Sequence, residues 1–104
     1  MKKYDVAGMK AVGYGQREKN VFHETREFKL RIIHLAPGES MPKCEMASHV
    51  IFVGIEGTAE VSAGPDKAPI AAGQVIVSEP GTLCMETDTG ARILGIQIIK
   101  RASE

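Results

Sequence analysis

The feature that most limits how this chain can fold is the length of its apolar runs. Apolar residues come mostly in runs of roughly four to eight, separated by turn residues in a chain with 11 Gly and 5 Pro. Short runs bounded by Gly and Pro are typical of β-strands, whereas an ordinary helix needs a longer amphipathic pattern. No such helical pattern is present, so the sequence predicts an all-β sandwich or barrel.

Six strands are predicted from these runs. Their ranges are 27–35, 49–55, 58–62, 75–77, 83–87 and 91–100. In the first strand, Phe28, Leu30, Ile32 and His34 share one face by period-two alternation. Residues 1–22 show no clear pattern, and we expect an N-terminal edge strand or loop there.

The run 49–55 is apolar on both of its faces. A strand of this kind needs cover on both sides, which a small barrel obtains only if a second subunit or segment shields its outer face. The β-branched last strand adds to this apolar surface. The sequence therefore predicts a homodimer.

Size and charge limit the partners and the compartment. The 104 residues fit one domain, and the 13 basic and 13 acidic side chains give no net charge. A nucleic-acid partner would need a basic patch, so none is expected. The sequence shows no apolar run of signal-peptide or transmembrane type, and two cysteines are too few for a disulfide scaffold. We therefore expect no membrane partner and a cytoplasmic location.

A first spaced motif follows residue 35. Gly38 is followed by five residues, then Cys44-x-Met46, three residues, Val50, six residues and Gly57. This spacing resembles the first motif of the cupin superfamily, which reads Gly, five residues, His-x-His, three or four residues, Glu, six residues and Gly. The glycines suit turns that need a positive φ or close chain approach.

A second motif resembles the second cupin motif, which reads Gly, five residues, Pro-x-Gly, two residues, His, three residues and Asn. Here Gly73 is followed by five residues, then 79–81 (Glu-Pro-Gly), then Cys84, then Asp88. With the preceding strand, the two motifs span about residues 28–99. The resemblance implies one small cupin domain over residues 1–104, a jelly-roll β-barrel that forms homodimers.

The resemblance also locates four side chains inside the barrel. In cupins these are three His and one Glu, a ligand set suited to Fe, Mn, Ni or Zn. The corresponding residues here are Cys44, Met46, Val50 and Cys84. No position keeps its usual residue, so the usual metal site is predicted to be absent.

Three functions stay open at this point. The first is a binding protein whose barrel holds a small apolar ligand, in a pocket made of Cys44, Met46, Val50 and Cys84, with His34 and Glu86 as possible polar members. The second is a soft-metal protein that binds Cu(I) or Zn through Cys44, Met46 and Cys84. The third is a cysteine-dependent redox enzyme that uses a cysteine as a redox or nucleophilic group, with a disulfide or redox pair of Cys44 and Cys84 as one form of it.

The three polar candidates each depend on strand alternation. His49 joins the metal ligands only through a bulge or register slip, because it points outward if Val50 points inward. His34 enters the pocket if its face of the first strand is the inner one. Glu86 shares a face with Cys84 and enters only if that face is inward.

Overall fold

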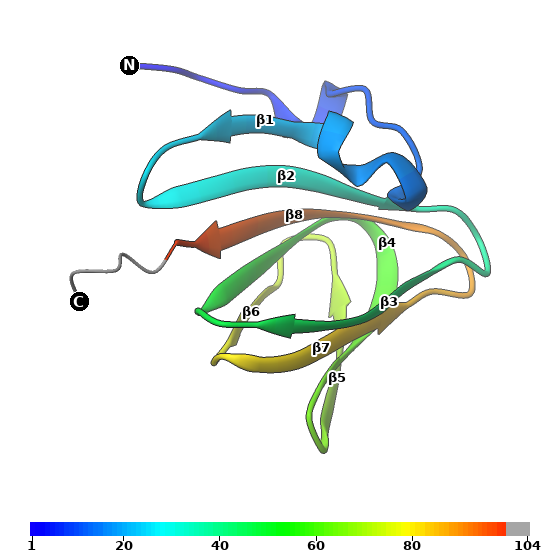
Figure 1. The fold of residues 1–104 in the computed structure, drawn as a ribbon. Helices are drawn as coiled ribbons and strands as arrows, with labels where there is room; N and C mark the ends of the chain where they lie inside the picture. Colours follow the sequence, from blue (N-terminus) through cyan, green and yellow to red (C-terminus); the bar gives the residue numbers. More distant parts are fainter. Residues whose placement is uncertain (100–104) are drawn as a thin grey trace.

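Two antiparallel β-sheets curl against each other and enclose an apolar core in the computed structural model, which describes residues 1–99 (Figure 1). Two 3-10 segments come first: η1 (Val6–Gly8) and η2 (Tyr14–Asn20). The strands are β1 (Val21–Glu24), β2 (Phe28–Leu35), β3 (Ser40–Met46), β4 (Val50–Ala63), β5 (Asp66–Ala71), β6 (Val75–Ser78), β7 (Gly81–Glu86) and β8 (Ala91–Ile98). The predicted all-β jelly-roll barrel is confirmed.

One long strand belongs to both sheets. The first half of β4 pairs with β8 and β6, and its second half pairs with β5 and β7. The first sheet therefore has the order β1-β2-β8-β4-β6, and the second has the order β5-β4-β7-β3. Because β4 crosses from one sheet to the other, the two sheets are held at the angle that encloses the core.

The sequence pattern predicted two strands, 49–55 and 58–62, where the structure has the single strand β4. Its register shifts between Gly54 and Glu56, and Gly57 has a φ of 71°. A bulge bends a strand without ending it, so the two glycines make a corner between the sheets rather than a turn between strands. A Cβ at Gly54 would lie 2.0 Å from the carbonyl oxygen of Ala71, so only glycine fits there.

Three strands were not predicted, and each lacks a clear apolar run. β3 and β5 each contain a proline and charged residues, which weaken a strand signal. β1 is a four-residue edge strand that follows η2, and half of it lies within the 1–22 segment where an edge strand or loop was expected. The predicted last strand is present as β8 to Ile98, and its expected end at residue 100 lies outside the described residues.

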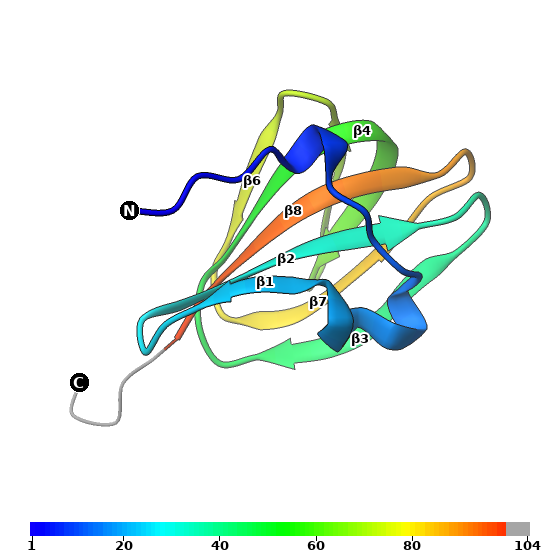
Figure 2. The ribbon, with the colours of Figure 1, turned by 90° about the horizontal axis from the view of Figure 1, so that it is seen from above.

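The core lies between the sheets and takes its β2 contribution from Ile33 and Leu35. The opposite face of β2, with Ile32 and His34, therefore points away from the core. The chain before β1 crosses this outer side of the first sheet (Figure 2). Its position is fixed by the Arg92 guanidinium, which donates hydrogen bonds to the carbonyls of Val6, Ala7 and Met9.

The two helical segments are both short. Within residues 1–99, no helix is long and apolar enough to span a bilayer.

Candidate functional site

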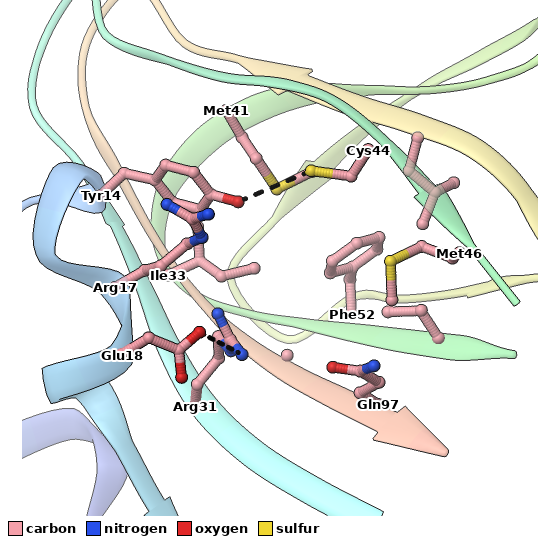
Figure 3. Close-up of a pocket in the computed structure, with 13 residues that line it drawn as sticks. Tyr14, Arg17, Glu18, Arg31, Ile33, Met41, Cys44, Met46, Phe52 and Gln97 are labelled. Carbon is pink, nitrogen blue, oxygen red and sulfur yellow. Dashed lines mark hydrogen bonds and ion pairs between the residues drawn. The ribbon is translucent and has the colours of Figure 1, made fainter. Parts of the chain in front are cut away.

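A cavity of about 190 Å³ lies between the two sheets (Figure 3). Six apolar side chains line it: Ile33, Met41, Met46, Val50, Phe52 and Leu83. Its polar rim is formed by Tyr14, Arg17, Glu18, Arg31, Cys44 and Gln97, with Gly95 between the strands. An apolar chamber with a few polar groups at one side is the usual form of a small-molecule site.

A bulge in β3 directs two sulfur-containing side chains into this cavity. Met41 lies opposite Met85 and Cys44 lies opposite Leu83, so two residues of β3 stand against one of β7 between these pairs. The extra residue lets Met41 and Cys44 face inward although they are three positions apart. Met46 then follows Cys44 on the same face, as the sequence predicted.

Of two further predicted pocket residues, Val50 lies in the cavity and Cys84 does not. Val50 is buried and lines the cavity as expected. Cys84 does not line it, because Leu83 and Met85 are the buried residues of β7 and Cys84 points to the outer face. The prediction that Cys84 faces Cys44 inside the barrel is therefore wrong.

The pairing of β3 with β7 shows how the structure differs from the motif. The residue that faces Cys44 across the strand pair is Leu83 rather than Cys84. A one-residue change of register exchanges the two faces of a strand.

The three polar candidates also lie outside the cavity. Glu86 is exposed on the outer face of β7 beside Cys84, and His49 is exposed just before β4. His34 lies on the outer face of β2 opposite Arg92, and its Nδ1 is buried without a hydrogen-bond partner within residues 1–99. His34 and Glu86 as pocket residues, and His49 as a metal ligand, are therefore not supported by the geometry.

The two cysteines are separate free thiols. They lie on adjacent strands, but their side chains point to opposite faces of the sheet. A disulfide needs Cβ atoms that approach each other, so Cys44 and Cys84 cannot pair without movement of the backbone.

Tyr14 links the N-terminal segment to the second sheet. Its hydroxyl lies 3.9 Å from Cys44 Sγ across the cavity, and Cys44 Sγ also donates to the Pro42 carbonyl at 3.4 Å (Figure 3). Burial raises the pKa of Tyr14, and the charge and hydrogen bond of Cys44 raise it further, while Arg17 and Arg31 act in the opposite direction. Tyr14 is therefore a neutral hydroxyl at ordinary pH.

Arg31 brings a positive charge to the cavity from the inner face of β2. Its side chain is 16% exposed and pairs with Glu18 of η2, whose side chain is 72% exposed, at 3.5 Å. Gly95 lies opposite Arg31 on β8 and leaves room beside it. Arg17 lies nearby, with its Cζ 5.0 Å from the centre of the Tyr14 ring.

Sequence reasoning missed most of this rim. Arg31 had a usable signal, because it alternates with Ile33 and Leu35 on the face of β2 opposite to the one containing Phe28. Tyr14, Arg17 and Glu18 had none, since they reach the cavity from a 3-10 segment without apolar periodicity.

The residues present do not fit the metal site that the family resemblance implies. Val50 offers no donor atom, and Leu83 takes the inner position predicted for Cys84. Cys44 and Met46 remain as one thiol and one thioether. In the described part of the chain, no group of three or more His, Cys, Asp or Glu side chains is arranged to hold a metal ion.

Comparison with known proteins identifies the fold. No family model matches the sequence, and no curated protein matches it. Among solved structures, a protein from Thermus thermophilus matches with a TM-score of 0.82 at 16% identity, covering 97% of this chain and 100% of that one.

Two further solved structures extend over nearly the whole chain. An RmlC-like cupin protein from Desulfovibrio desulfuricans has a TM-score of 0.74 at 20% identity, covering 95% of this chain and 96% of that one. An uncharacterized Klebsiella pneumoniae protein with a double-stranded β-helix domain has a TM-score of 0.75 at 14% identity, covering 97% and 99%. Similarity at this level of identity concerns the fold.

Proposed function

We propose that this chain, which has the cupin fold, binds a small and mostly apolar molecule in the cavity between its two sheets. The observation that carries this proposal is the cavity of about 190 Å³ lined by six apolar side chains. Apolar cavities of about 150 Å³ can hold a benzene molecule, so this one has room for roughly a single ring.

The cavity reaches the surface of the molecule, which gives a ligand a way in. Its rim includes Arg17 and Glu18, both exposed on η2. Its far wall includes Phe52 and Leu83, which are each 2% exposed. A ligand entering at the polar rim would therefore exchange water for buried apolar surface, which favours binding.

A pair of cysteine variants tests this proposal. Cys44→Leu places a larger side chain inside the cavity, whereas Cys84→Leu makes the same change on the outer face of the neighbouring strand. Binding of neutral single-ring compounds such as benzyl alcohol, followed by calorimetry, is expected to be lost in Cys44→Leu and kept in Cys84→Leu. Equal binding by both variants would mean that the ligand site lies elsewhere.

The soft-metal alternative retains only part of its predicted ligand set. Of the proposed Cu(I) or Zn ligands, Cys44 and Met46 line the cavity, with Met41 as a third sulfur beside them. Elemental analysis of protein purified with reductant tests it. A stoichiometric metal that is lost in Cys44→Ser and kept in Cys84→Ser would favour this alternative over the apolar ligand.

The redox alternative loses its second thiol, because Cys84 faces outward. The polar contacts of Cys44 Sγ within residues 1–99 are the Tyr14 hydroxyl and the Pro42 carbonyl. Neither group is a base or a cation that would activate a thiol. We therefore give the cysteine-dependent enzyme no role in the proposed function.

We further propose a homodimer formed through the outer face of the first sheet. Two cross-strand rows of apolar residues run over this face: Val77, Ile51, Ile96 and Leu30 in one, and Val75, Val53 and Leu94 in the other. The second row continues to Ile32, which is already buried in the single chain and adds nothing to the surface available to a partner. Val75 and Val77 are 57% and 65% exposed. A second copy of the chain can cover this surface and the β6 edge together, because a two-fold interface brings one patch against itself.

The proposed compartment is the cytoplasm. Both cysteines are free, and Cys44 contributes to the ligand cavity as a thiol. A reducing compartment preserves that state.

A further inference from the structure

We propose that the ligand of this cavity is a small carboxylate, with one ring or a branched aliphatic chain in the apolar chamber and its carboxylate at Arg31 and Arg17. This inference rests on the proposed function, because it assigns the chemical class of the molecule that the cavity binds.

Arg31 is the principal group in this assignment. Its side chain is largely buried, and its guanidinium lies between Glu18 and the cavity (Figure 3). A guanidinium has five N–H donors, and Glu18 contacts Arg31 through one oxygen at 3.5 Å. Arg31 therefore keeps N–H donors for a carboxylate at the cavity rim. A planar guanidinium can bind both oxygens of a carboxylate at once.

Arg17 supplies a second positive charge to the same rim. It lies over the ring of Tyr14, and no carboxylate of residues 1–99 comes within 4.0 Å of it. The charged side chains that line the cavity are thus two guanidinium groups and one carboxylate. The rim has one excess positive charge, and a monoanion balances it.

The Glu18 carboxylate favours a carboxylate ligand over a phosphate ester. A phosphate monoester carries nearly two negative charges at neutral pH and would be repelled by Glu18 beside Arg31. A carboxylate carries one. The cavity volume sets the other limit, since about 190 Å³ holds one ring rather than two.

Phenylacetate, phenylacetamide and phenyl phosphate separate these possibilities, with binding measured by calorimetry at low ionic strength. Phenylacetate and phenylacetamide have nearly the same shape and differ in charge. We expect phenylacetate to bind about tenfold or more tightly than the amide, which is the usual size of a charge-assisted contact at a partly buried site. Phenyl phosphate is expected to bind more weakly than phenylacetate.

Variants that remove one positive charge each show which arginine binds the carboxylate of the ligand. Arg31→Gln should reduce phenylacetate affinity to that of the amide, and Arg17→Gln, at an exposed position, should reduce it by about threefold. Arg26→Gln removes a charge from an exposed turn and should change nothing.

The outcomes distinguish this inference from the proposed function. If the acid and the amide bind equally, the anion assignment is wrong and the apolar site stands. If phenyl phosphate binds most tightly, the carboxylate assignment is wrong. If none of the three compounds nor benzyl alcohol binds, the proposed function fails as well.

Discussion

Tyr14 is the side chain that closes the cavity over Cys44. It is 8% exposed, and its hydroxyl faces a thiol rather than water. Burial disfavours the charged phenolate, so the pKa of Tyr14 in the folded protein lies above the ordinary value of 10.0. The unfolded chain releases that proton near the ordinary value.

This difference predicts a loss of stability in alkali. Between the unfolded and folded pKa values of Tyr14, the folded state binds more protons, so the free energy of unfolding falls as pH rises from about 10. The contribution of the raised Tyr14 pKa to the free energy of unfolding is fully present below that pH. Ultraviolet titration of Tyr4→Phe, which leaves Tyr14 as the sole tyrosine, should give a pKa above 10 that returns to about 10 in urea. An unchanged pKa on unfolding would contradict the assigned environment.

The positions of single residues could be predicted only where the motif spacing held. Cys44, Met46 and Val50 line the cavity at the positions that the motif spacing had located inside the barrel, and β3 pairs regularly with β7 from Cys44 to Met46. Cys84 faces outward because β7 is offset by one residue from the expected register, with Leu83 opposite Cys44. An offset of one residue leaves the composition of a strand unchanged and reverses its faces, so the apolar pattern did not reveal it.

At the scale of elements, the corner in β4 sets the angle between the sheets. Gly54 is packed against the Ala71 backbone, and Gly57 takes a positive φ. In the sequence, Gly54 lay within the predicted strand 49–55, and Gly57 lay in the predicted break before the strand 58–62. Gly at a bulge and Gly at a turn have the same local signature, and only the pairing with β8 and β5 distinguishes them.

Gly54→Ala should destabilise the fold. Its Cβ would lie 2.0 Å from the Ala71 carbonyl oxygen, which is backbone and cannot move aside cheaply. We expect a loss of about 2–4 kcal/mol in the free energy of unfolding, measured by urea denaturation. Gly15→Ala is the control, because a Cβ there meets nothing within 4 Å. Equal denaturation midpoints for the two variants would show that the corner tolerates a side chain.

At the scale of the whole molecule, the apolar outer face of the first sheet predicts association. Val75→Glu and Val77→Glu place charges on side chains that are exposed in the single chain, so the fold should remain intact. Light scattering should show a change from twice the chain mass of 11.2 kDa to that mass. Val12→Glu, at an exposed position outside the two apolar rows, should remain a dimer. A wild-type monomer at all concentrations would contradict the proposed dimer.

The barrel itself was predictable from short runs and turn glycines, whereas the cavity rim was not. Turn spacing is local and predicts a sandwich or barrel, and the resemblance to cupins implied the jelly-roll arrangement. Arg31 and Tyr14 meet at the rim through contacts between distant segments, since η2 packs beside β2 and reaches β3.

The central claim is that the cavity between the sheets binds a small molecule, and methyl NMR of labelled methionine tests it most directly. Of the five methionines, Met41 and Met46 line the cavity, while Met1 and Met9 lie in the N-terminal segment. Titration with phenylacetate should shift the Met41 and Met46 methyl signals with one common saturation curve and leave those of Met1 and Met9 in place. Saturable shifts confined to Met1 and Met9, or none at all, would contradict the account.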